Sequence, residues 1–162
     1  MANLAAWGPL WNEYPDYINY TSQQVKEMIG GDVNIPMITN TCAVRLSRTL
    51  NYNQLPLPAG FPDLNYQKGA DGMRYCYRVR EIRKWLMFRI GKPEFDITKK
   101  ADADFDKTAL AGMKGIIGFD IHFPDATGHL DLWDGLIFSS EHKTTRDYWK
   151  AATRIWLWQV RS

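Results

Sequence analysis

One cysteine and one histidine stand in sequence settings that suit nucleophilic catalysis. Cys42 follows Asn40, a good helix N-cap residue, so we expect the thiol in the first turn of a helix. The amides and dipole of a helix start favour a thiolate, and a nearby imidazolium favours it further. His129 opens a predicted β-hairpin and supplies that ring. The sequence therefore predicts a Cys42 nucleophile with His129 as its general base.

The residues after His129 predict which group faces its ring. Asp134-Gly135 indicates a two-residue type I′ turn between strands over residues 129–133 and 136–139. In that register Ser140 lies opposite His129. Geometry thus favours Ser140 as the residue that orients the imidazole.

Two acidic residues are alternatives to Ser140. Asp131 lies two residues from His129, so it shares the same face of the strand and brings a charge. Glu141 would point to the other face unless a bulge intervenes. The sequence leaves the choice open between Ser140, Asp131 and Glu141.

Hydrophobic spacing predicts the elements that must position these groups. Apolar residues recur at helical spacing after Thr21, after Cys42 and between Val79 and Ile90, and residues 4–20 suit a short helix. Strands are expected at 116–123, 129–133, 136–139 and 154–160, and loops at 54–71 and 96–106, the first of which can wall a cleft. Helices precede antiparallel strands, which predicts the α+β class. From the length of the chain we expect residues 1–162 to form one domain.

The predicted helix over residues 79–90 is rich in basic residues. A phosphate site or an acidic partner would suit them, but a solvated face whose long stems cover apolar surface is the favoured interpretation. The residues concerned are Arg78, Arg80, Arg83, Lys84 and Arg89.

The composition excludes several classes of function. The 162 residues carry 20 basic and 18 acidic side chains, a net charge of +2, which argues against a nucleic-acid or membrane-surface partner. No secretory signal or membrane-spanning run is present in the sequence, so we expect synthesis in the cytoplasm. Seven Trp and eight Tyr exceed the needs of the core, and some of these rings should line a groove.

The remaining cysteine and histidines predict no further chemistry. Cys42 and Cys76 are expected to be free thiols, with Cys76 a packing residue. His122, His129 and His142 lack the spacing of zinc hydrolases, and no glycine-rich phosphate loop is found, so no metal and no cofactor are expected.

Several segments, taken in order, resemble one known family, the type VI secretion amidase effectors of the fourth family. The cysteine-then-histidine order is that of papain-like amide hydrolases. The matching segments are NTCAVRLS at 40–47, GAD at 69–71, YRV at 77–79, GKP at 91–93 and GHLDLWDG at 128–135.

The resemblance implies a papain-like fold related to the NlpC/P60 group, with Cys42 as nucleophile and His129 as base. It further implies cleavage of peptidoglycan peptides at the D-glutamate–meso-diaminopimelate bond, delivery by the secretion apparatus into a rival's periplasm, and a cognate immunity protein. The family usually has an acidic or other polar third residue after the hairpin, where this chain has Ser140. The alternatives are a papain-like hydrolase or deamidase acting on another peptide, or a wall-binding module without catalysis.

Overall fold

A four-stranded antiparallel sheet lies at the centre of the fold, with side chains packed on both of its faces. The computed structural model describes residues 2–122 and 127–160. The strands lie in the order β3-β6-β4-β5, so β5 is an edge strand. Their bounds are Phe95–Thr98 for β3, Gly115–Asp120 for β4, Gly128–Trp133 for β5 and Arg154–Gln159 for β6.

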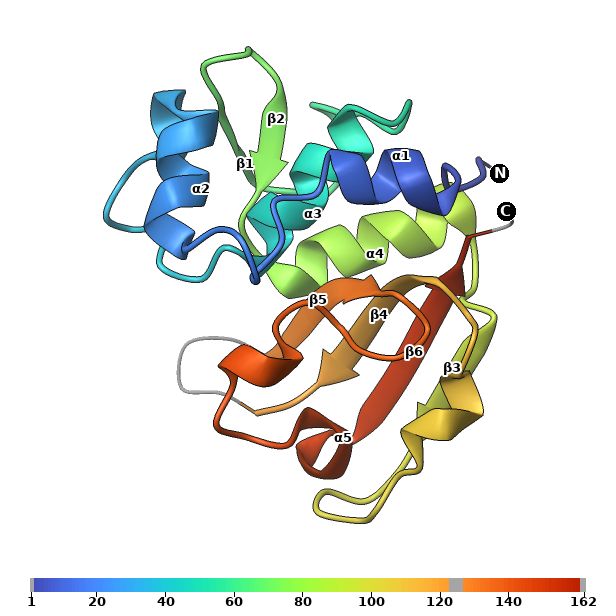
Figure 1. The fold of residues 1–162 in the computed structure, drawn as a ribbon. Coiled ribbons are helices and arrows are strands. Elements are labelled where there is room, and N and C mark those ends of the chain that lie inside the picture. The colour runs from blue at the N-terminus through green and yellow to red at the C-terminus, as the bar shows by residue number, and fades with distance from the viewer. Residues whose placement is uncertain (1, 123–126, 161–162) are drawn as a thin grey trace.

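Alternating side chains of these strands supply two separate cores. Ile116 of β4, Leu130 of β5 and Trp156 of β6 pack under three helices, which lie above the sheet in Figure 1. These helices are α1 (Trp7–Asn12), α3 (Cys42–Asn51) and α4 (Val79–Ile90). The predicted helix-spaced positions of α3 and α4, among them Leu46 and Ile82, are buried in this layer.

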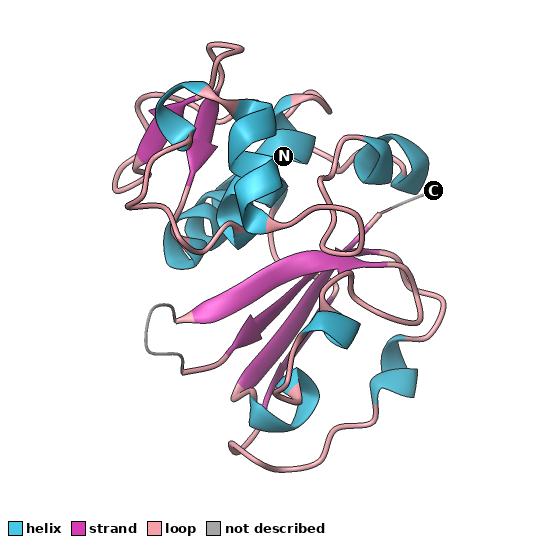
Figure 2. Cartoon of the chain, turned by 60° about the vertical axis from the view of Figure 1, so that its left-hand side comes forward, coloured by secondary structure: helices cyan, strands magenta, loops and turns pink. Residues whose placement is uncertain are grey.

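The opposite face of the sheet carries the second core. Ile117, Phe119 and Leu157 pack there with Trp149 of α5 (Tyr148–Ala151). The short 3₁₀-helices η2 (Lys107–Leu110) and η3 (Glu141–Lys143) lie on the same side. Figure 2 shows the resulting arrangement, with longer helices on one side of the strands and short helices on the other.

A third, smaller cluster holds α2 (Ser22–Ile29) against a hairpin of β1 (Tyr66–Lys68) and β2 (Arg74–Cys76). Thr21 and Gln24 form the predicted capping box of α2. The 3₁₀-helix η1 (Gly31–Val33) follows, and Gly31 has φ 57° with the hairpin backbone so close that a Cβ would lie 2.7 Å from a Gly69 backbone carbon.

Three local predictions are wrong. Residues 136–139 form no strand, because the chain turns away after a single bridge between Trp133 and Phe138. Residues 66–68 and 96–98, predicted as loop, are strands. Both run along a single neighbour and bury little, so no apolar alternation marks them. The predicted strand over 116–123 ends at Asp120, and Phe123 lies outside the described residues.

The helices come first and pack on an antiparallel sheet, which confirms the predicted α+β class. Within the described part of the chain, no helix is both long and apolar enough to cross a bilayer.

Candidate active site

Cys42 is the first residue of α3, and only 1 % of its surface is exposed. Asn40 was predicted to be the N-cap residue of α3, but it is not. It lies one residue further out, where its Oδ1 accepts a hydrogen bond of 3.0 Å from the Cys42 amide. Thr41 takes the N-cap position, and its hydroxyl accepts from Nε of Arg45 instead of from the helix amides. The thiol nevertheless lies in the first turn, as predicted.

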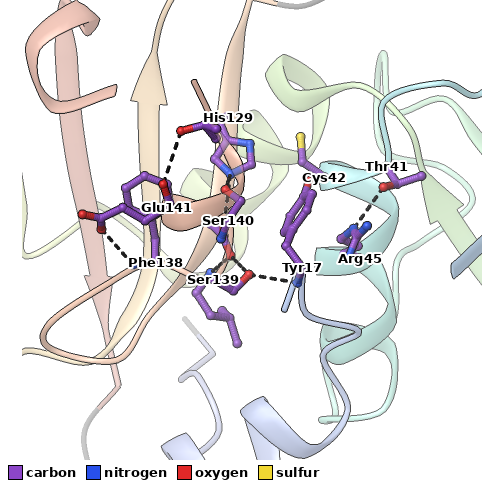
Figure 3. Close-up of polar contacts among 12 residues, drawn as sticks. Tyr17, Thr41, Cys42, Arg45, His129, Phe138, Ser139, Ser140 and Glu141 are labelled. Atoms are coloured by element: carbon purple, nitrogen blue, oxygen red, sulfur yellow. Dashed lines mark hydrogen bonds and ion pairs between the residues drawn. The ribbon is translucent and has the colours of Figure 1, made fainter. Parts of the chain in front are cut away.

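His129 is the second residue of the edge strand β5 and is 5 % exposed. Its ring lies against the rings of Tyr17 and Tyr148, at centroid distances of 5.7 and 5.2 Å. The Cys42 side chain lies close enough to the His129 ring to raise the pKa of the imidazole. Figure 3 shows the two side chains approaching from β5 and from the start of α3. The fold therefore brings the predicted pair together across the open edge of the sheet.

The predicted hairpin register is wrong by two residues. The bridge joins Trp133 to Phe138, and the Asp134 amide donates to the Ile137 carbonyl, so the turn spans residues 134–137 rather than 134–135. In this register Ser140 lies beside Asp131 rather than opposite His129. A shift of two residues preserves the face of the strand, because side chains alternate with a period of two.

Ser140 and Asp131 consequently both reach the same ring nitrogen. Nε2 of His129 lies 3.0 Å from Oδ2 of Asp131 and 3.0 Å from Oγ of Ser140. Glu141 forms no hydrogen bond with His129 or Asp131 among the described contacts. Its carboxylate pairs with Lys107 at 2.6 Å instead. The two leading candidates are thus neighbours, and the third lies apart.

Asp131 is fully buried and surrounded by donors. Its Oδ1 accepts from the hydroxyls of Tyr14 and Ser139 at 2.8 and 2.6 Å, and from the Leu132 amide. Its Oδ2 accepts from the Ser140 amide as well as from His129. Burial alone would raise the pKa of Asp131, but His129 and the hydroxyl donors outweigh it and hold the pKa below its usual value. Asp131 is therefore an anion at neutral pH.

The charge of Asp131 acts directly on His129. Burial alone lowers the pKa of the imidazole, yet the hydrogen bond and negative charge of Asp131, together with the neighbouring Cys42 side chain, raise it to about 9. Because this pKa exceeds the ordinary 6.5, the charged ring stabilises the fold fully below pH 6.5, and that contribution is lost as pH rises through about 9. With Nε2 turned to Asp131, the other ring nitrogen is left for the thiol.

Sequence reasoning missed three residues that build this site. Tyr14 bonds Asp131, and Tyr17 packs on His129 with its ring 3.6 Å from the Arg45 guanidinium carbon. Arg45 is fully buried, and its Nη2 has no hydrogen-bond partner among the described residues. Two features of the sequence could have pointed to these residues. One is the aromatic run before residue 20, and the other is the position of Arg45 one turn after Cys42.

The other candidate groups lie outside the site. Cys76 is a free, buried thiol, and burial raises its pKa to about 12, so it is an inert packing residue as predicted. His122 and His142 are exposed. Within the described residues, no cluster of histidine, cysteine and acidic side chains could hold a metal ion.

A pocket of about 580 Å³ opens along the start of α4, and neither Cys42 nor His129 is among its lining residues. It reaches Asn40 and Thr127, which stand two residues before Cys42 and His129. Pro62 and Asp63 line it too, so part of the irregular segment 54–71 does form a wall, as predicted.

Comparison with known proteins connects this geometry to one family. Residues 38–158 match the family model described as type VI secretion system (T6SS), amidase effector protein 4 (Tae4). The crystal structure of Tae4 from Enterobacter cloacae is 28% identical, covers 99% of this chain and 100% of its own, and gives a TM-score of 0.82. No curated protein sequence matches.

Complexes are similar to this chain as well. The Tae4–Tai4 effector–immunity complex from Enterobacter cloacae matches at 29% identity and a TM-score of 0.83, with 99% of this chain and 100% of that chain covered. The Tae4/Tai4 system from Salmonella typhimurium matches at 26% identity and a TM-score of 0.84, with 98% of this chain and 99% of that chain covered.

We predict that Asp131→Asn lowers kcat on a peptide amide substrate by roughly ten- to a thousandfold, because the ring loses its charged partner. Ser140→Ala should cost less, about tenfold at most, since Asp131 still holds Nε2. Steady-state kinetics of both variants test whether Asp131→Asn loses more activity than Ser140→Ala. Melting temperatures are measured in parallel. A larger loss in Glu141→Gln than in Asp131→Asn would contradict this assignment.

The pH profile separates orientation from mere packing. We expect kcat/KM of the unaltered protein to hold through neutral pH and fall as pH passes about 9, where His129 loses its proton. In Asp131→Asn the charge that favours the imidazolium is absent, so the alkaline limit should move to lower pH. An identical alkaline limit in both proteins would show that Asp131 does not control the ring.

Proposed function

Since the chain belongs to the type VI secretion system amidase effector 4 family, we propose that it is a peptidoglycan endopeptidase that cleaves the D-glutamate–meso-diaminopimelate bond with Cys42 as nucleophile. Amidase effectors of this family act as antibacterial toxins. The observation that carries the assignment of the site is the approach of Cys42, at the start of α3, to the ring of His129, whose Nε2 lies 3.0 Å from Oδ2 of Asp131.

The reaction proceeds in two halves. The Cys42 thiolate attacks the carbonyl carbon of the scissile amide, and amides in the first turn of α3 stabilise the oxyanion. The protonated His129 then donates its proton to the amide nitrogen, the C–N bond breaks, and a thioester remains on Cys42. Water attacks the thioester with His129 as base, which releases a carboxylic acid and regenerates the thiol.

Asp131 takes the role of positioning residue in this scheme. Asp131 supplies a negative charge to the ring, while Ser140 takes the later position, at which the resemblance implies an acidic or other polar residue. Its burial and full complement of donors support this assignment, because a buried carboxylate with fixed partners holds an imidazole in one orientation. Ser140 adds a second contact to the same nitrogen.

Two protein partners follow from the family. We infer that a component of the type VI apparatus delivers the chain, and that a cognate immunity protein covers the cleft beside Cys42. The similar effector–immunity structures of Tae4 with Tai4 support the second inference.

The substrate locates the site of action in the periplasm of the target cell. Stem peptides are incorporated into the wall outside the inner membrane, and no helix of the described residues is suited to cross that membrane. We infer that the protein is made in the cytoplasm of the producing cell and causes no damage there.

The first test is chemical. Purified protein should release soluble fragments from sacculi, and mass spectrometry should find new D-glutamate carboxyl and diaminopimelate amino ends. Cys42→Ala should abolish the release while retaining the fold, because alanine fits the buried first turn and no other group attacks. The matched control is Cys76→Ala, which removes the other buried thiol and should retain activity. Release by Cys42→Ala at the rate of the unaltered protein would refute the mechanism.

The second test is cellular. We expect expression in a bacterial cytoplasm to be harmless and expression with a periplasmic signal sequence to cause lysis. Cys42→Ala in the periplasm should restore growth. Growth curves of the three strains check this, and either cytoplasmic toxicity or lysis by the periplasmic variant would show a different target or a non-catalytic action.

A further inference from the structure

The pocket beside the catalytic pair is rich in positive charge, and the mechanism above leaves that charge unexplained. We call it the basic pocket. Its wall runs along the first turns of α4, and one end reaches Asn40, whose side chain holds the Cys42 amide. The charged residues that line it are Arg78, Arg80, Arg83 and Lys84 on the basic side, and Asp63 and Glu81 on the acidic side.

Helical spacing gathers the basic side chains. Arg80, Arg83 and Lys84 stand at i, i+3 and i+4, so they share one flank of α4, while Ile82 and Leu86 face the core. The helix begins at Val79 in this pocket, and no side chain caps its N-terminus. The partial positive charge of the helix start adds to that of the side chains.

One of these cations is already committed. Arg83 donates to both carboxylate oxygens of Asp120, at 3.0 and 3.2 Å, in a half-buried pair. Its guanidinium also lies 5.0 Å from the Trp156 ring. Arg83 therefore anchors α4 to the sheet.

Two further pairs are weak. Arg78 contacts Glu81 at 3.2 Å, but the arginine side chain is 58 % exposed. Lys84 and Asp63 are 3.8 Å apart and largely exposed. Exposed pairs of this kind contribute little to stability, so Arg78 and Lys84 can turn to a ligand.

Arg80 is the available cation. It is exposed, lines the pocket, and has no ion pair or side-chain hydrogen bond among the described residues. A planar guanidinium in this state is suited to a carboxylate, which it binds through two parallel hydrogen bonds.

We propose that the basic pocket binds the free carboxylates that flank the scissile amide of the substrate, with Arg80 as the principal contact. This inference rests on the proposed function. D-Glutamate joined through its γ-carboxyl leaves its α-carboxylate free, and diaminopimelate carries a second carboxylate on its side arm. The protein is therefore selective for wall peptides in which these carboxylates are not amidated.

The structure divides the basic residues that the sequence grouped together. Arg89, in the last turn of α4, is exposed and lies outside the basic pocket. It fits the solvated-face interpretation, whereas Arg80 on the same helix does not. Arg89 thus provides a matched control with the same charge and helix.

The experiment compares two synthetic stem peptides, one with the α-carboxylate of D-glutamate free and one with it amidated. We expect kcat/KM of the unaltered protein to favour the free carboxylate by about tenfold, in line with loss of a charge-assisted bond. Arg80→Gln should lower kcat/KM for the free peptide about tenfold and remove most of the preference. Arg89→Gln should behave as the unaltered protein. A second peptide pair, amidated at diaminopimelate, tells which carboxylate Arg80 binds.

The outcomes separate this proposal from the function on which it rests. If the unaltered protein cleaves neither the peptides nor sacculi, the proposed function is wrong, and the pocket assignment with it. If it cleaves both peptides of each pair equally, or if Arg80→Gln matches Arg89→Gln, the pocket assignment alone is overturned. Weaker binding of an immunity protein by Arg80→Gln, with unchanged hydrolysis, would likewise overturn it and assign the pocket to that partner. Circular dichroism verifies that both variants fold.

Discussion

The buried carboxylate of Asp131 is the interaction on which the site depends. An ionised carboxylate without partners is costly to bury, so each of its oxygens must receive hydrogen bonds. Tyr14 donates from the segment between α1 and α2, and Ser139 and Ser140 donate from the chain after the hairpin. One charge thereby ties two further segments to the edge strand, and the one with Tyr14 is distant in the sequence. His129 completes the set and receives its orientation in return.

The edge position of β5 explains how a helix residue and a strand residue meet. Leu130 and Leu132 point into the core under α3 and α4, so His129 and Asp131 point to the other face. In the described part of the chain no strand pairs with the outer edge of β5, which leaves room for the start of α3 to bring Cys42 to the imidazole. The proposed catalysis needs this open edge, and Tyr17 packs against His129 there.

Charge is distributed unevenly around this edge. Cys42, His129 and Asp131 are buried, whereas Arg80 and Lys84 of α4 are exposed. Burial strengthens the interaction of Asp131 with His129, because the local dielectric is low. Arg80 is exposed and has no side-chain hydrogen bond or ion pair among the described residues. The two arrangements suit the two proposed tasks: a fixed internal charge that orients His129, and an outward charge that selects a ligand.

Local patterns determined the helices, the first-turn position of Cys42 and the strand that carries His129, because capping and apolar spacing act within a few residues. They also narrowed the orienting group to residues near the hairpin. Only the tertiary structure decided the four-residue turn, the edge strands β1 and β3, and the contacts of Tyr14 and Arg45. Turn length depends on where residues 138–140 pack, and edge strands pair through backbone atoms that leave no side-chain pattern. The partners of Asp131 come from segments more than a hundred residues apart, and only folding brings them together.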